Sequence, residues 1–379
     1  MHLPFSFLLH SIQFLQPSPR PVGQEALGIL QDEGLQGLSG FLAVLHPPGI
    51  DFAHPVQGEG GEPALGGAYT GLARDASALF YNPAGLAQLR LSIASLSGSY
   101  QSYRWSGIPG RFDQYGGTVL LAKQNAGFGV CLMKRGDRKD QVWRYRAPGD
   151  SAGPYSLLNQ EMAFVAGVSQ PLSDGGAIGF AGRYLRTTAP AWGLPGEVEK
   201  KNGLALDVGL LLPLSRGVLV GVSAQNVFSR KYDYLVYDDY GSVLIFSKAP
   251  VRINVGMSLQ ATPGVLFALE GSDLWKQKLT EKRTGATYNT QPVWRFGQET
   301  ALPDSLRLRL GVSRTRVPVV FVPTGPQSYV SRNTYSAGLG YLGEAFALDF
   351  AIAMDERERD MAVKPTSTLR YVLTLMRRM

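Results

Sequence analysis

From Leu91 onward, apolar residues alternate with small or polar residues in segments of about ten residues. Alternation with a period of two is typical of β-strands that have one apolar face. The clearest examples are 251–260 and 345–353. The pattern predicts fourteen strands, at about 92–103, 115–122, 127–134, 160–170, 177–187, 203–212, 218–227, 250–260, 264–274, 293–300, 305–313, 333–342, 345–354 and 367–376.

The connections between these predicted strands alternate strictly between short and long. The short ones mostly contain Gly, Pro, Asp or Asn, as tight turns do. Antiparallel neighbours would then carry all short turns at one end and all long loops at the other, which is the geometry of outer-membrane barrels. We therefore predict an all-β fold, a closed antiparallel transmembrane β-barrel of about fourteen strands. The long connections are 104–114, 135–159, 188–202, 228–249, 275–292, 314–332 and 355–366.

The same alternation assigns a face to each charged residue of the predicted strands. In 251–259 the odd-numbered positions are apolar and the even-numbered ones are small or polar. In a barrel surrounded by lipid, the less apolar face is the lumen. Two interpretations stay open for the lumen charges: they neutralise one another as ion pairs, or they line a polar channel or ligand path. These residues are Arg183, Asp207, Arg252, Glu270, Glu299, Arg307, Arg309, Asp349 and Arg370.

Composition is consistent with a membrane barrel. Charged residues make up 18% of the chain, below the roughly 25% of soluble proteins. No apolar run is long enough for a transmembrane helix, whereas barrel strands hide their apolar face in alternation. The formal charge of +7 is not concentrated as in nucleic-acid-binding proteins. Residues 135–146 are basic and aromatic, and predict either a solvated extracellular loop or a contact with anionic outer-leaflet glycolipid.

Catalytic chemistry has little support in this sequence. The single Cys131 excludes an internal disulfide and a cysteine-rich metal site. All four His precede residue 60, and no nucleophile-elbow, phosphate-loop or dinucleotide motif is present. We therefore expect no enzymatic activity, no cofactor and no metal. Residues 1–60 show no convincing signal peptide, because no Lys or Arg precedes their first apolar run, and we expect them to be a leader or a poorly ordered extension.

A stretch of small residues, Gly66–Leu86, precedes the first predicted strand. Asp75 is a good N-cap for a short helix over Ala76–Tyr81, since its carboxylate can accept from free backbone N–H groups. Asn82 and Pro83 end that helix and open a second turn. The segment's glycines allow tight bends or close backbone approach. We predict two small capped helical turns that fit inside a larger structure.

The same stretch resembles the N-terminal segment of the outer-membrane transport family typified by the long-chain fatty acid transporter FadL. The likeness is closer still to the PorV-like and uncharacterised members, which share "A-x-G-G-A…D-x-x-A…N-P-A-G-L". It implies that residues 61–90 form a hatch inside a barrel of residues 91–379. The hatch residues to which the resemblance assigns gating are Gly66, Gly67, Ala68, Asp75, Ala76, Asn82, Pro83, Ala84, Gly85 and Leu86.

The resemblance also implies a function. In the outer membrane of a diderm bacterium, such a barrel would transport hydrophobic small molecules or gate their passage. The PorV-like relatives suggest an alternative, a component of a protein secretion system that binds exported cargo. A purely structural outer-membrane barrel is a third reading. Expected partners are outer-membrane lipid together with a hydrophobic ligand, or secretion-system and cargo proteins, and no nucleic acid.

Overall fold

The structure is a computed structural model that divides into two units, residues 1–45 and 46–379. All described residues belong to the second unit, so the expectation for residues 1–60 lies outside them. The described residues are 61–89, 91–105, 108–123, 126–137, 143–145, 155–157, 160–190, 198–230, 234–237, 243–246, 249–280, 287–319, 328–357 and 368–378.

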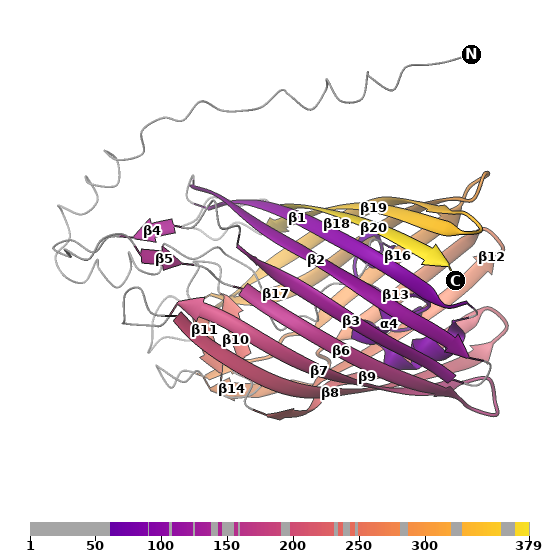
Figure 1. The fold of residues 1–379 in the computed structure, drawn as a ribbon, viewed down its shortest axis with the longest axis horizontal. Helices are drawn as coiled ribbons and strands as arrows, with labels where there is room; N and C mark the ends of the chain where they lie inside the picture. Colours follow the sequence, from indigo (N-terminus) through magenta and orange to yellow (C-terminus); the bar gives the residue numbers. More distant parts are fainter. Residues whose placement is uncertain are drawn as a thin grey trace, which may run out of the picture. The chain divides into compact units, whose positions relative to one another are not determined.

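Fourteen strands form a closed antiparallel barrel, which confirms the predicted fold class (Figure 1). Each strand pairs with its sequence neighbours in the barrel, and β1 pairs with β20 to close it, with Ile93 opposite Arg378. The barrel strands are β1 (Ile93–Trp105), β2 (Ile108–Lys123), β3 (Ala126–Asp137), β6 (Gln160–Pro171), β7 (Ala177–Pro190), β8 (Val198–Ser215), β9 (Val218–Arg230), β12 (Arg252–Thr262), β13 (Val265–Ser272), β16 (Val293–Ala301), β17 (Leu306–Val319), β18 (Ser328–Leu342), β19 (Phe346–Arg357) and β20 (Thr368–Arg378).

The prediction that short and long connections alternate strictly is wrong at the first long connection. Strand β1 ends at Trp105 and β2 begins at Ile108, and these two residues are paired. The predicted loop 104–114 is therefore mostly strand. The apolar–polar pattern depends on lipid contacting one face, whereas backbone pairing continues past the lipid boundary. Strands β8, β17 and β18 are longer than predicted at the same end for the same reason.

Three two-stranded hairpins lie in connections that were expected to be loops. Each strand spans only three or four residues, which is too short for a period of two to be recognised. The hairpins are β4 (Trp143–Tyr145) with β5 (Tyr155–Leu157), β10 (Tyr234–Tyr237) with β11 (Val243–Phe246), and β14 (Lys278–Thr280) with β15 (Thr287–Asn289).

The outward face of the barrel is an apolar belt. On β19, Phe346, Leu348, Phe350 and Met354 point outward and are each more than 40% exposed. Water-exposed apolar patches on soluble monomers rarely exceed a few hundred Å², whereas a continuous apolar band is what a lipid-embedded barrel requires. Among the described residues, no helix has the length and apolar character needed to cross a bilayer.

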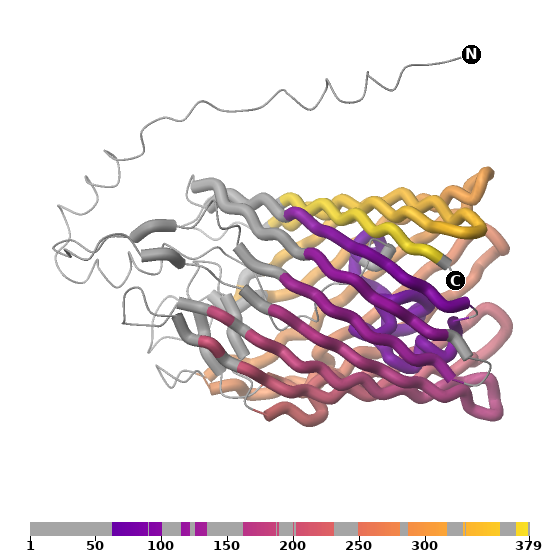
Figure 2. Tube along the Cα trace, viewed as in Figure 1, coloured from indigo at the N-terminus to yellow at the C-terminus, as the bar shows by residue number. Residues whose placement is uncertain are grey.

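The hatch, of which residues 61–89 are described, lies inside the barrel near the end that carries the short turns (Figures 1 and 2). It contains α3 (Gly61–Ala64), α4 (Ala78–Tyr81) and the 3₁₀ helix η3 (Pro83–Gln88). Asn82 caps η3 by accepting from the Ala84 N–H, with Pro83 at the first position, as predicted. The predicted start of α4 is wrong: its N-cap is Ser77, and Asp75 accepts a hydrogen bond from the Ser77 N–H instead.

Candidate functional site: the hatch and the lumen wall

The hatch passes close to inward-facing glycines of the barrel wall. A Cβ atom added at any one of nine glycines would lie less than 3.0 Å from a hatch atom. Each of these glycines belongs to a different strand, so small wall residues make room for the hatch almost all the way round. The nine are Gly127, Gly167, Gly179, Gly209, Gly221, Gly256, Gly297, Gly311 and Gly338.

These contacts trace the course of the hatch around the inside of the wall. It begins with Ala64 against β18 and Leu65 against β16 and β17. Thr70 then lies against β9 and β12, Asn82 against β8, and Leu86 against β3. Glycine supports this path within the hatch too, because Gly66 and Gly67 have φ values of 66° and 79°, which other residues rarely adopt. The hatch thus contacts most of the circumference.

On one side of the lumen, a carboxylate of the wall holds the hatch backbone. Glu270 of β13 accepts hydrogen bonds from the N–H groups of Tyr69 (2.9 Å) and Thr70 (2.8 Å). Its other oxygen accepts from Arg295 of β16 at 2.7 Å. Ser258 of β12 donates to the Gly71 carbonyl at 2.9 Å. Glu270 is buried, and hydrogen bonds to a charged group are stronger than those between neutral groups. These bonds therefore attach the hatch firmly to the wall.

Next to Glu270, an ion-pair network connects the hatch to three further strands. Arg74 of the hatch pairs with Glu299 of β16 at 2.6 Å. Glu299 also pairs with Arg307 and with Arg309 (2.8 Å), both on β17. Arg309 continues to Asp349 on β19. The network therefore spans β16, β17 and β19 and neutralises charges that would be costly to bury alone.

A short internal contact stiffens the hatch where it meets this network. The Tyr69 hydroxyl donates to the Asp75 carboxylate. Burial raises the pKa of the Tyr69 phenol well above its ordinary value, and the negative charge of Asp75 raises it further. The phenol therefore stays protonated and remains a donor. Its ring also meets Tyr81 edge-on, with centroids 5.8 Å apart.

The opposite side of the lumen is mostly apolar, with Arg183 of β7 as a buried charge. Leu79, Phe80 and Leu86 of the hatch belong to one buried cluster with inward residues of β2, β3, β6 and β7. All three are at most 2% exposed. The polar contacts on this side reach the backbone, since Gln225 donates to the Phe80 carbonyl and Asn82 to the Thr70 and Leu210 carbonyls. The wall members of the cluster on these four strands are Leu120, Cys131, Met133, Ala163, Val165, Ala181 and Leu185, and the cluster continues to Leu266 and Ala268 of β13.

The remaining predicted lumen charges fall in two separate pairs. Arg183 donates to Asp207 (2.8 Å) and to Asn226 (2.7 Å), and Asn226 adopts a φ of 55° at a bulge between β8 and β9. Arg252 makes two bonds to Asp273, at 2.7 and 3.1 Å. Arg370 is half-buried and has no ion pair among the described residues.

The predicted hatch residues are buried in the structure, except Asp75, which is half-buried. Four partners of the lumen charges were missed from the sequence: Arg74, Asn226, Asp273 and Arg295. Arg295 could have been predicted to face the lumen, because it is in phase with Glu299 on the same strand. Asp273 lies one residue beyond the end of β13 and Asn226 sits at a bulge, so alternation places neither of them.

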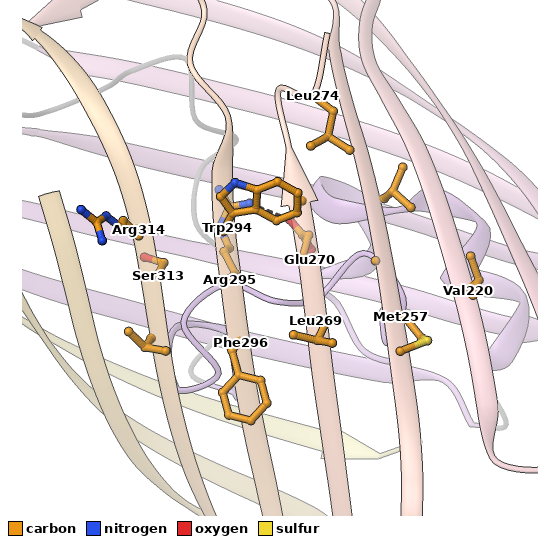
Figure 3. Close-up of a pocket in the computed structure, with 14 residues that line it drawn as sticks. Val220, Met257, Leu269, Glu270, Leu274, Trp294, Arg295, Phe296, Ser313 and Arg314 are labelled. Carbon is orange, nitrogen blue, oxygen red and sulfur yellow. Dashed lines mark hydrogen bonds and ion pairs between the residues drawn. The ribbon is translucent and has the colours of Figure 1, made fainter. Parts of the chain in front are cut away.

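An apolar pocket of about 600 Å³ lies on the outward face of the wall (Figure 3). Trp294, Phe296, Leu269, Met257 and Leu274 border it, with Arg314 at one edge and the Glu270–Arg295 pair beneath (Figure 3). Its volume is within the roughly 300–1,000 Å³ of ligand pockets. An apolar molecule seated there would be on the lipid side, with one strand layer between it and the hatch.

The comparisons agree with this architecture at the level of the fold. No protein-family model and no curated protein matches the sequence. Among solved structures, the Pseudomonas putida toluene transporter TodX is similar with a TM-score of 0.62 at 14% identity, covering 86% of this chain and 99% of TodX. The CymD monoaromatic hydrocarbon channel gives 0.60 at 12% identity, covering 85% and 97%. A Pseudomonas aeruginosa FadL homologue gives 0.57 at 13%, covering 84% and 97%. The chain therefore has the FadL-type fold that the hatch motif implied.

Proposed function

We propose that this protein is an outer-membrane barrel that admits hydrophobic small molecules through its lumen when the hatch moves. The observation that carries the proposal is the two-sided lumen. Apolar residues of β2, β3, β6 and β7 cover one side and pack on the hatch, while the ion pairs of β13–β19 hold its other side. If the hatch withdrew from the apolar side, it would uncover a path suited to apolar molecules.

Two further observations support the location and the substrate class. The outward apolar belt suits a lipid environment, and in outer-membrane barrels the short turns face the periplasm. The hatch would then lie near the periplasmic end. The similar solved structures are named as toluene or monoaromatic hydrocarbon transporters and channels, so we take small hydrocarbons as the first substrates to test. The PorV-like alternative has no specific support among the described residues.

Deletion of residues 61–86 tests the gating role. The strands form their own hydrogen bonds, so we expect the deleted protein to fold and to show heat-modifiable mobility on gels. In planar bilayers its conductance should exceed that of the intact protein. Unchanged conductance in a folded deletion variant would refute gating by the hatch.

Uptake measurements test the substrate class. Cells that lack their own hydrocarbon channels would express the intact protein and receive labelled toluene, a labelled long-chain fatty acid or labelled glucose. We expect faster uptake of a hydrophobic compound and no change for glucose. Faster uptake of glucose alone would instead indicate a polar pore through the charged side of the lumen.

A further inference from the structure

The outer wall carries basic side chains at the long-loop end of the apolar belt. Lys134 on β3, Arg186 on β7, Lys200 on β8 and Arg230 on β9 all point outward, because each is in phase with exposed residues of its strand. Figure 1 shows these strands together with β6 as neighbours. We call these four residues the basic row.

The pairing register places the basic row close to one line that runs across the strands. Lys134 lies opposite Met162 of β6, Met162 opposite Arg186, and Arg186 opposite Asn202 of β8. Neighbouring strands are about 4.8 Å apart, so the backbones at Lys134 and Arg186 are about 10 Å apart. Lys200 lies two residues from Asn202 on one side of this line, and Arg230, opposite Leu204, lies two residues from the line on its other side. Long Lys and Arg side chains can therefore converge on one ligand.

Among the described side chains, none balances the charge of the basic row. None of its four members has an ion pair with a described residue, and no acidic side chain points outward from the described parts of β3 and β6–β9. Elsewhere on the outer wall the charges are mixed, since Glu356 of β19 and Arg316 of β17 are both exposed. The row is therefore a concentrated positive patch on one sector of the barrel.

Large apolar side chains lie immediately below the row, toward the short-turn end. Leu132 is two residues from Lys134 on the same face of β3, and Phe228 is two residues from Arg230 on β9. Phe164 of β6 lies between them. These three side chains are 56%, 56% and 47% exposed. The surface thus presents cationic groups at the edge of an apolar wall, which matches an amphiphile with an anionic headgroup.

We propose that this surface binds a phosphorylated lipid of the outer leaflet, with its phosphate groups on the basic row and its acyl chains along Leu132, Phe164 and Phe228. Assignment to the outer leaflet rests on the proposed outer-membrane location. Phosphate is the fitting headgroup because it carries more than one negative charge and several acceptor oxygens, which guanidinium groups bind bidentately. We assign the phosphate to a lipid because the basic row lies at the boundary where headgroups meet the apolar belt.

The test compares lipid binding by native mass spectrometry in neutral detergent, with diphosphorylated lipid A as the probe. A variant with Lys134→Gln, Arg186→Gln, Lys200→Gln and Arg230→Gln removes the row. Each basic residue near an anionic surface contributes about fivefold to affinity, so removing all four should weaken binding by about 600-fold. A control with Arg216→Gln, Lys276→Gln, Lys278→Gln and Arg316→Gln removes the same number of exposed Lys and Arg residues elsewhere, and should bind like the unmodified protein.

If the row variant does not fold, measurements on the unmodified protein still test the proposal. The unmodified protein should bind dephosphorylated lipid A at least tenfold more weakly than the diphosphorylated form, and 0.5 M salt should weaken only the latter. Equal binding of both lipids, an equal loss in the control variant, or full binding by a folded row variant would each overturn the proposal. The conductance gained on deleting the hatch should be the same with and without the row, so failure here is distinct from failure of the proposed function.

Discussion

The two sides of the lumen hold the same hatch by different physical means. On the side of β13, β16, β17 and β19, buried carboxylates bind N–H groups and a guanidinium of the hatch. On the side of β2, β3, β6 and β7, apolar side chains pack on Leu79, Phe80 and Leu86. Ionic contacts are strong but demand particular geometry, whereas apolar packing is non-directional. We therefore expect the apolar side to open first and the ionic side to act as the anchor.

A native probe can measure opening of the apolar side. Cys131 is the sole cysteine, and it is buried on the inner face of β3 in the same cluster as Leu79 and Phe80. Its rate of reaction with a water-soluble maleimide should follow the fraction of molecules in which the hatch is displaced. Each loss of 1.4 kcal/mol in hatch attachment would raise this rate about tenfold.

The largest effect is expected from Glu270→Ala, which breaks the anchor. It leaves two hatch N–H groups and the Arg295 guanidinium without their acceptor. Removing one partner of a buried pair costs about 3–5 kcal/mol, so Cys131 labelling should rise more than a hundredfold. Glu344→Ala, in an exposed short turn, is the control and should have no effect. If Glu270→Ala labels like the control, the carboxylate does not anchor the hatch.

Leu79→Ala tests the apolar side and should rank second. Leu79 is completely buried, and Leu→Ala changes at such sites cost about 2–5 kcal/mol. We expect labelling to rise about a hundredfold, with little change in conductance while the anchor holds. The matched control is Leu132→Ala on β3, whose side chain faces outward. A conductance increase as large as that of Glu270→Ala would contradict the idea that only the apolar side opens.

Tyr69→Phe tests the hydrogen bond between Tyr69 and Asp75 within the hatch, and it should have a smaller effect. It removes the hydroxyl that donates to Asp75 but keeps the ring contact with Tyr81. A hydrogen bond to a charged carboxylate contributes at least about 1.5 kcal/mol, so labelling should rise about tenfold. Tyr115→Phe, at an exposed outward position, serves as the control. A hundredfold rise would mean that this hydrogen bond, and not Glu270, holds the hatch in place.

The sequence predicts those parts of the molecule whose surroundings impose a periodic pattern on it. All fourteen barrel strands follow from alternation, because lipid on one face and a filled lumen on the other impose a period of two. Pairing beyond the lipid, as between Trp105 and Ile108, leaves no such trace. The lumen position of Glu270 follows from its phase, but its hatch ligands, Tyr69 and Thr70, are 201 and 200 residues away. The nine wall glycines are visible in the sequence, yet only the path of the hatch explains them.

The smallest effect is expected from Arg74→Gln, although Arg74 is the hatch residue that joins the ion-pair network. Its side chain is 37% exposed, whereas that of Glu299 is 3% exposed. Removing Arg74 leaves Glu299 with Arg307 and Arg309, so no buried charge loses its last partner. Partly exposed pairs contribute at most about 1 kcal/mol, and Cys131 labelling should rise less than fivefold. Arg309→Gln is the contrasting variant, because it deprives both Glu299 and Asp349 of a buried partner, and it should act more strongly although it does not contact the hatch. If Arg74→Gln exceeds Arg309→Gln, the anchor consists of the single Arg74 contact and not of the network behind it.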